Sequence, residues 1–177
     1  MTTATPDRLR VLVAGVGNIF LGDDAFGVEV AQRLAQRHLP ETVRVVDFGI
    51  RSRDLAYTLL DDYDAVVLVD ALTRGGRPGT LYVLEPNPAT ASTPSFDGHS
   101  LDPAKVLGLV AALGGQVRRL LVVGCEPMMP ADADEMSMGL SEPVRAAVDE
   151  AIPLIESLVT KLLGAGAEAL ASGPQGR

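Results

Sequence analysis

Short apolar runs separated by turn-forming residues dominate the chain, and they predict five β-strands. The runs lie at 9–15, 43–48, 65–70, 80–84 and 120–124. The run AVVLVD at 65–70 is the most apolar, so we expect it in the middle of a sheet covered on both faces. The connection 71–79 is too short for a helical crossover, so the fourth strand should run antiparallel to the third, at or near an edge.

Apolar residues at helical spacing predict four helices among these strands. The helices are expected at 24–37, 51–60, 103–113 and 141–163. Ser141 suits the N-cap of the last helix, and Pro153 should kink it. Since the run 164–177 is small and polar, we expect a single domain at 1–163 followed by a flexible tail at 164–177.

The order β-α-β-α-β-β-α-β-α predicts an α/β three-layer sandwich. Its sheet should be twisted, five-stranded and mostly parallel, with one antiparallel strand and helices on both faces. Ligands of such sheets bind beyond the carboxyl ends of the strands, so functional side chains are expected on that edge. The chain has 177 residues, which suits one domain with a proper core.

The composition narrows the function classes. A net charge of −8 repels phosphate backbones and disfavours nucleic acid as a partner. The one cysteine, Cys125, cannot form an internal disulfide, which favours a reducing compartment. The opening MTTATPDRLR has no apolar stretch after its charges, and no apolar run approaches the roughly 20 residues that span a bilayer. We therefore expect a cytoplasmic protein with no membrane partner.

Candidate chemistry lies at the expected carboxyl edge. Asp23 and Asp24 follow the first strand, Asp47 and Asp70 end the second and third strands, and His99 lies in the long loop before the third main helix. Each has a plain structural interpretation, as a helix N-cap, a backbone cap or an unused loop histidine. Two carboxylates from this group and the imidazole of His99 would together form a borderline ligand set that suits nickel, zinc, iron or manganese.

The loop GVGNIFLGDD is rich in glycine but does not match a phosphate-binding loop. Gly15, Gly17 and Gly22 permit a tight turn and close approach of the backbone. A dinucleotide fingerprint requires glycine where the chain has Phe20, and the acidic end of the loop disfavours pyrophosphate. Cys125 could be a nucleophile if His99 lay beside it, although an inert thiol is the simpler interpretation.

These residues also carry a resemblance. The segment VLVAGVGNIFLGDDAFGVEVAQRL resembles the opening of the nickel–iron hydrogenase maturation proteases. The likeness continues in VVDFG, AVVLVDAL, PGTLYVLEP, GHSLDPAKVL and VVGCEP, in the same order and spacing, from about 9 to 163. The glycine loop is the most specific of these segments.

The resemblance implies a function. Members of this family are endopeptidases that remove a short C-terminal extension from the precursor of the hydrogenase large subunit, after nickel has been installed. It implies that Asp24, Asp70 and His99 contact that nickel, and that Asp24 and Asp70 are catalytic. The metal would arrive with the substrate, so no permanently bound cofactor is implied. The residues expected to bind the precursor's tail are Gly15, Gly17, Asn18, Gly22, Asp23 and Asp47.

The chain departs from the family pattern at three positions. Asp24 stands where some relatives carry Glu, Phe48 where many have Gly, and Cys125 where the residue is usually aliphatic. Three other functions stay open: a nucleotide-binding module, a non-catalytic assembly factor that binds the same precursor, and a stand-alone metallohydrolase. For a peptidase, either a carboxylate acts as general base towards water or the metal polarises the carbonyl.

Overall fold

Two fully buried strands form the centre of the sheet. They are β1 (Val11–Val16) and β3 (Ala65–Ala71), which pair in parallel. The sheet order is β2-β1-β3-β5-β4, with β2 (Val43–Gly49) and β5 (Leu120–Cys125) also parallel to the central strands. The strand β4 (Leu81–Leu84) pairs antiparallel with β5 at one edge. The predicted five-stranded sheet with one antiparallel strand is confirmed.

The structure is a computed structural model that describes residues 8–86, 103–128 and 137–171. Within these ranges, no helix combines the length and the apolar character needed to cross a membrane. His99, one of the candidate residues, lies outside the described residues.

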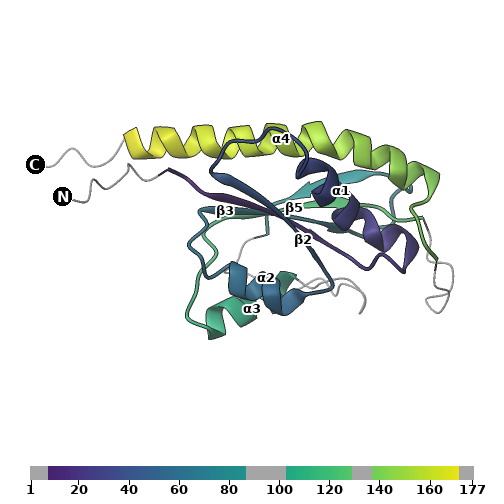
Figure 1. The fold of residues 1–177 in the computed structure, drawn as a ribbon, viewed down its shortest axis with the longest axis horizontal. Helices are drawn as coiled ribbons and strands as arrows, with labels where there is room; N and C mark the ends of the chain where they lie inside the picture. The colour runs from purple at the N-terminus through teal and green to yellow at the C-terminus, as the bar shows by residue number, and fades with distance from the viewer. Residues whose placement is uncertain (1–7, 87–102, 129–136, 172–177) are drawn as a thin grey trace, which may run out of the picture.

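Helices cover both faces of the sheet, as predicted (Figure 1). The helices α1 (Phe26–Leu34) and α4 (Glu142–Ala171) lie on one face. The helices α2 (Ser52–Thr58) and α3 (Pro103–Ala112) lie on the other. A short 3-10 turn, η1 (Gly22–Ala25), connects β1 to α1.

The alternation of side chains along β1 divides the core into two layers. Val11 and Val13 belong to the cluster that packs under α1 and α4, whereas Leu12 and Ala14 belong to the cluster under α2 and α3. A strand covered on both faces must be apolar at every position, which explains the unbroken run in the sequence. Polar residues are therefore excluded from the middle of such a strand and occur at its ends.

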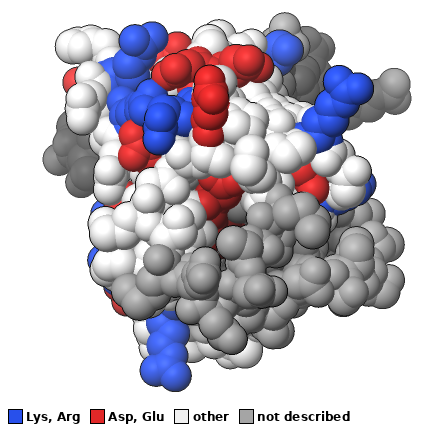
Figure 2. Space-filling view, turned by 90° about the vertical axis from the view of Figure 1, so that its right-hand side faces the viewer, with Lys and Arg blue, Asp and Glu red and all other residues white. Residues whose placement is uncertain are grey.

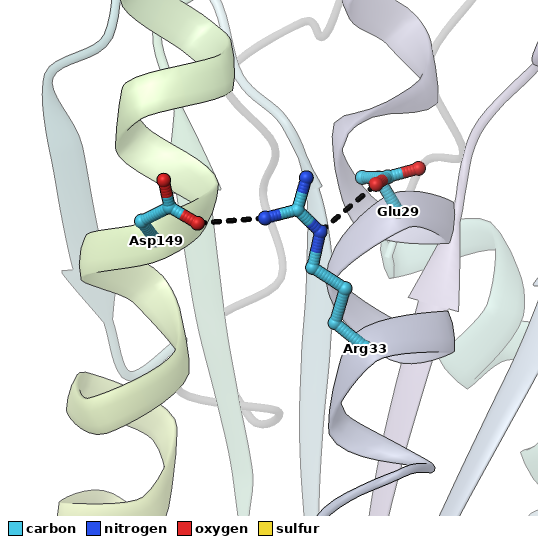
Figure 3. Close-up of polar contacts among 3 residues, drawn as sticks. All are labelled: Glu29, Arg33 and Asp149. Atoms are coloured by element: carbon cyan, nitrogen blue, oxygen red, sulfur yellow. Dashed lines mark hydrogen bonds and ion pairs between the residues drawn. The ribbon is translucent and has the colours of Figure 1, made fainter.

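Ion pairs on the surface join the two helices of one layer. Arg33 lies between Glu29 of its own helix and Asp149 of α4, at 2.9 Å and 2.6 Å (Figure 3). Exposed pairs of this kind contribute about 0–1 kcal/mol each. These ion pairs add little stability. The apolar contacts of the cluster that contains the fully buried Phe26 therefore contribute most to holding α1 and α4 on the sheet.

The last helix is longer than predicted. We expected it to end at residue 163 and a flexible tail to follow, but α4 continues to Ala171. The segment after Leu163 reads GAGAEALA, and alanine has the highest helix propensity of all residues, which compensates for two glycines. The predicted end of this helix at residue 163 is therefore wrong.

The start of α1 lies unusually close to the ends of β1 and β3. A Cβ atom on Gly27 would lie under 3.0 Å from the carbonyl oxygens of Val16 and Val69, closer than real Cβ atoms come. A Cβ atom on Gly15 would likewise clash with the Gly27 backbone and with Ala31. Only glycine at these positions lets the helix backbone rest directly on the strands.

This close approach predicts a specific stability effect. Gly27→Ala should destabilise the protein by about 2–4 kcal/mol, because helix and strands must move apart. The matched control is Gly108→Ala in α3, where an added Cβ meets nothing within 4 Å and should stabilise by up to about 1 kcal/mol. Urea denaturation measures both, and a Gly27→Ala variant as stable as the wild type would contradict this packing.

Candidate active site at the carboxyl edge of the sheet

The chain changes direction between β1 and β3. After β1 the chain moves outward to β2, and it then crosses back over β1 to β3. The adjacent strands β1 and β3 are therefore followed by connections that lead to opposite sides of the sheet. Such a switch point leaves a crevice beyond the carboxyl ends of the two strands. Asp24 follows β1 and Asp70 lies near the end of β3, so both belong to this crevice. Figure 2 looks onto this edge and shows acidic atoms recessed near its centre.

Asp70 is a buried acid with an unsatisfied oxygen. Its residue is only 5% exposed, and among the described residues its Oδ1 has no hydrogen-bond partner. Burial, and then the charge of Asp24, raise the pKa of Asp70 well above 3.8, and the Ala71 backbone N–H opposes them only in part. A buried carboxyl oxygen without a partner costs folding free energy, which is typical of a functional site.

Asp24 is held in place by the loop that precedes it. Its Oδ2 accepts a hydrogen bond of 2.7 Å from the backbone N–H of Asn18. The Asn18 side chain in turn accepts the Phe20 N–H at 3.0 Å, which fixes the turn. The charge of Asp24 contributes to the raised pKa of Asp70, so the two carboxyl groups interact electrostatically.

Asp23 has a different environment from its neighbour. Its carboxylate accepts the backbone N–H groups of Met128 at 2.9 Å and Ser141 at 2.7 Å, and the Ser141 hydroxyl at 2.8 Å. It thereby connects the β1–α1 turn to the segments on either side of the β5–α4 loop. Neither Asp23 nor Asp24 is the N-cap of a helix. The N-cap residues of η1 and α1 are Leu21 and Ala25, and no side-chain hydrogen bond caps either helix.

Asp47 supports the neighbouring turn. Its Oδ1 accepts the Gly49 N–H at 2.9 Å, and its Oδ2 accepts a 3.0 Å hydrogen bond from the side chain of Gln32. Gly49 has a positive φ of 53°, and its carbonyl accepts the Gly17 N–H at 3.0 Å. Phe48, which departs from the family pattern, is skipped in the register between β1 and β2 and is buried.

The glycines of the first loop are occupied by contacts within the chain. Gly17 has a φ of 142°, and a Cβ there would overlap the Asp24 carbonyl. Gly22 has a φ of 55°, and its N–H donates to Ser137 at 2.7 Å. Gly17 is needed for close packing against Asp24 and Gly22 for the positive φ of the turn, which removes the reason to assign them to a nucleotide phosphate.

Glu126 is an acid of this edge that the sequence did not suggest. It is 4% exposed, and it accepts hydrogen bonds from the backbone of Arg74 and Gly75 and from the Tyr82 hydroxyl, at 2.7, 3.1 and 2.8 Å. Burial acts to raise the pKa of Glu126, but these donors outweigh it and the pKa is lowered. Gly75 and Gly76 mark a turn whose N–H groups need an acceptor, but nothing in the local sequence identifies Glu126, 51 residues from Gly75, as that acceptor.

The described residues contain only part of the expected metal-binding set. They include no group of three or more His, Cys, Asp and Glu side chains placed to hold a metal ion. The structure thus brings Asp24 and Asp70 together, whereas the third expected residue, His99, lies outside the described ranges.

Comparison with known proteins gives a consistent picture. A model of the family "Hydrogenase maturation protease" matches residues 28–158, a range that includes Asp70 but not Asp24. A putative hydrogenase maturation protease of Methanocaldococcus jannaschii is 35% identical, over 85% of this chain and 97% of that protein. The hydrogenase 2 maturation protease of Escherichia coli is 32% identical, over 92% of this chain and 96% of its own.

Solved structures of hydrogenase maturation peptidases have a similar fold. The hydrogenase maturating endopeptidase HybD of Escherichia coli superposes with a TM-score of 0.72 and 29% identity, covering 86% of this chain and 93% of that chain. A hydrogenase 2 maturation peptidase from a thaumarchaeon has a TM-score of 0.65 and 29% identity, covering 85% and 98%.

The buried Asp70 predicts a stability change with a definite pH dependence. Because its pKa is higher in the folded than in the unfolded state, ionising it costs stability, and this cost grows as pH rises from about the ordinary value of 3.8 to the folded pKa. Asp70→Asn stays neutral, so the metal-free variant should melt above the wild type near neutral pH. The gain should vanish at acid pH.

Calorimetry from acid to neutral pH measures this difference. The exposed Asp61→Asn is the matched control and should show no gain. An Asp70→Asn variant that melts at or below the wild type near neutral pH would disprove the cost assigned to the buried charge.

The Cys125 thiol is expected to be inert. It is fully buried, and burial, followed by the charges of Asp23 and Glu126, raises its pKa to about 12. The nucleophile is the thiolate, so a disulfide reagent at neutral pH should modify the native protein at least about a hundredfold more slowly than the urea-unfolded chain. Equal rates, followed by absorbance, would restore the nucleophile interpretation.

Proposed function

We propose that this chain, which belongs to the hydrogenase maturation protease family, removes the C-terminal extension from the nickel-loaded precursor of a nickel–iron hydrogenase large subunit. Membership of this family makes the chain a peptidase. The observation that carries the specific proposal is the buried Asp70, which has an oxygen without a hydrogen-bond partner among the described residues and lies beside Asp24. Such a pair favours a cationic ligand over a neutral one.

The nickel of the precursor is the cation that fits this account. Carboxylate oxygens from Asp24 and Asp70, with the imidazole of His99, would form a borderline ligand set suited to nickel. A cation near the two carboxyl groups would offset both causes of the raised pKa of Asp70, so binding of the nickel favours the ionised form of Asp70. Since the metal belongs to the substrate, we propose no permanently bound cofactor.

Recognition of the metal also explains how an immature precursor is left uncut. The nickel joins the precursor to two residues on rigid elements, which places the scissile peptide in the crevice by proximity. A precursor without nickel lacks this binding energy. The remaining loop residues support the arrangement, because Asn18 orients Asp24 and Gly17 permits its close packing.

Hydrolysis by water follows from the residues at hand. An ionised carboxylate of the pair accepts a proton from water as it attacks the scissile carbonyl, or the nickel polarises that carbonyl directly. The inert Cys125 removes the thiol as a nucleophile within the described part of the chain. A pH–rate profile that follows the ionisation of a single carboxyl group would favour general-base catalysis by that carboxylate over polarisation of the carbonyl by nickel.

Two neighbouring functions are separated by simple measurements. A non-catalytic assembly factor would bind the precursor and leave its length unchanged. A stand-alone metallohydrolase would hold a stoichiometric metal after purification, detectable by elemental analysis.

We place the protein in the cytoplasm, because its single cysteine requires no oxidising compartment.

The proposal predicts loss of cleavage when either acid is removed. Asp24→Ala and Asp70→Ala should each slow removal of the tail from nickel-loaded precursor by about a hundredfold or more. The exposed Asp61→Ala is the matched control and should cleave like the wild type. Mass spectrometry of the precursor follows the loss of the tail, and full cleavage by either variant would refute the assignment of the pair.

The metal requirement is tested with the same assay. Nickel-free precursor should stay uncut by the wild-type protein over the time in which nickel-loaded precursor is processed completely. Equal cleavage of both forms would contradict recognition of the metal.

A further inference from the structure

Exposed apolar side chains lie on the segments at the carboxyl edge of the sheet, where the acid pair also lies. We call this set the apolar rim, and it consists of Ile19, Phe20, Ile50, Met128 and Met138. Its most exposed members, Ile50 and Met138, are 72% and 74% exposed. The rim residues come from four segments: the β1–η1 turn, the residue after β2, the segment after β5 and the segment before α4. All four segments lie at the carboxyl edge of the sheet.

Hydrogen bonds join the segments that carry the rim. The Gly17 N–H donates to Gly49 at 3.0 Å, which places the end of β2 against the first loop. The Ser137 N–H donates to Phe20 at 3.1 Å, and Ser137 accepts the Gly22 N–H at 2.7 Å. The rim therefore belongs to one connected surface rather than to separate loops.

Asp23 completes this connection. Its carboxylate binds the N–H of Met128 and both the N–H and hydroxyl of Ser141, on either side of the β5–α4 loop. The residue next to Asp24 in sequence thus holds two rim-bearing segments against the catalytic turn. The position of the rim is fixed relative to the acid pair.

Single exposed apolar residues are ordinary on protein surfaces, and this chain has others. Tyr57, Val83, Leu109 and Leu113 are also exposed, but they lie on or directly after α2, α3 and β4. The rim differs because five such side chains from four joined segments share the edge where Asp24 and Asp70 lie. This grouping is typical of an interaction site.

The charge of this edge defines the partner. Figure 2 shows acidic atoms recessed near the centre of the face, with further acidic and basic side chains above them. The chain carries a net charge of −8, so an acidic partner segment would be repelled. Methionine side chains are flexible and polarizable, which suits them to an irregular peptide surface. An apolar segment without acidic residues satisfies these conditions.

We propose that the apolar rim docks an apolar, non-acidic segment of the precursor polypeptide, next to the bond that is cut. The inference rests on the proposed function, because the rim lies at the same edge of the sheet as Asp24 and Asp70, which the nickel of the precursor would reach. Docking through the rim is independent of nickel. The metal and the rim therefore provide two separate contributions to binding of the precursor.

Binding of nickel-free precursor tests the rim without turnover, since this form is expected to stay uncut. Phe20→Ser and Met138→Ser should each raise the dissociation constant about tenfold, as expected for the loss of an apolar anchor. The matched controls are Tyr57→Ser and Leu113→Ser, which remove exposed apolar side chains from other elements and should leave the constant within about twofold. Titration calorimetry measures all five proteins.

The outcomes separate the two proposals. If the rim variants bind nickel-free precursor like the wild type, or if the wild type does not bind it, the rim inference is wrong even where nickel-loaded precursor is processed. If the wild type binds and the rim variants do not, but no precursor is cut, docking through the rim is supported and the proposed function fails. With nickel-loaded precursor, the rim variants should raise KM and leave kcat within about twofold.

Discussion

The contact of helix α1 with the ends of the two central strands is the constraint on which the site depends. Gly27 lies so close to the carbonyl oxygens of Val16 and Val69 that no larger residue fits. This contact holds the turn η1, with its acids, over the end of β3. The acid pair is thus a result of backbone packing, and the energy that holds it comes from apolar burial around α1.

The acids that gather at this edge differ in how they are satisfied. Asp23 and Glu126 each accept three hydrogen bonds, and they fix the loops on either side of the crevice. Asp70 is as buried as Glu126, but within the described residues one of its oxygens accepts none. Carboxylates with full sets of donors hold a structure together, whereas one without them is available to a ligand. This distinction assigns the structural and functional roles more sharply than sequence position does.

The sequence predicts those features that depend on local pattern. The buried run ending in Asp70 places that residue correctly because a strand covered on both faces must be apolar throughout. The pattern did not indicate the roles of Asp23 and Glu126, because their partners lie up to 118 residues away. It also missed the extension of α4, where alanine-rich sequence outweighs the glycines. The fourth strand has the predicted direction, but it pairs with β5, which only the full topology determines.

Burial and the charge of Asp24 together disfavour the ionised form of the Asp70 carboxyl group in the metal-free protein. The most direct measurement is the pH titration of the Asp70 side-chain carboxyl carbon by NMR in the metal-free protein. The account predicts a midpoint well above 3.8, and a lower midpoint in the Asp24→Asn variant. A wild-type midpoint at or below 3.8 would contradict it.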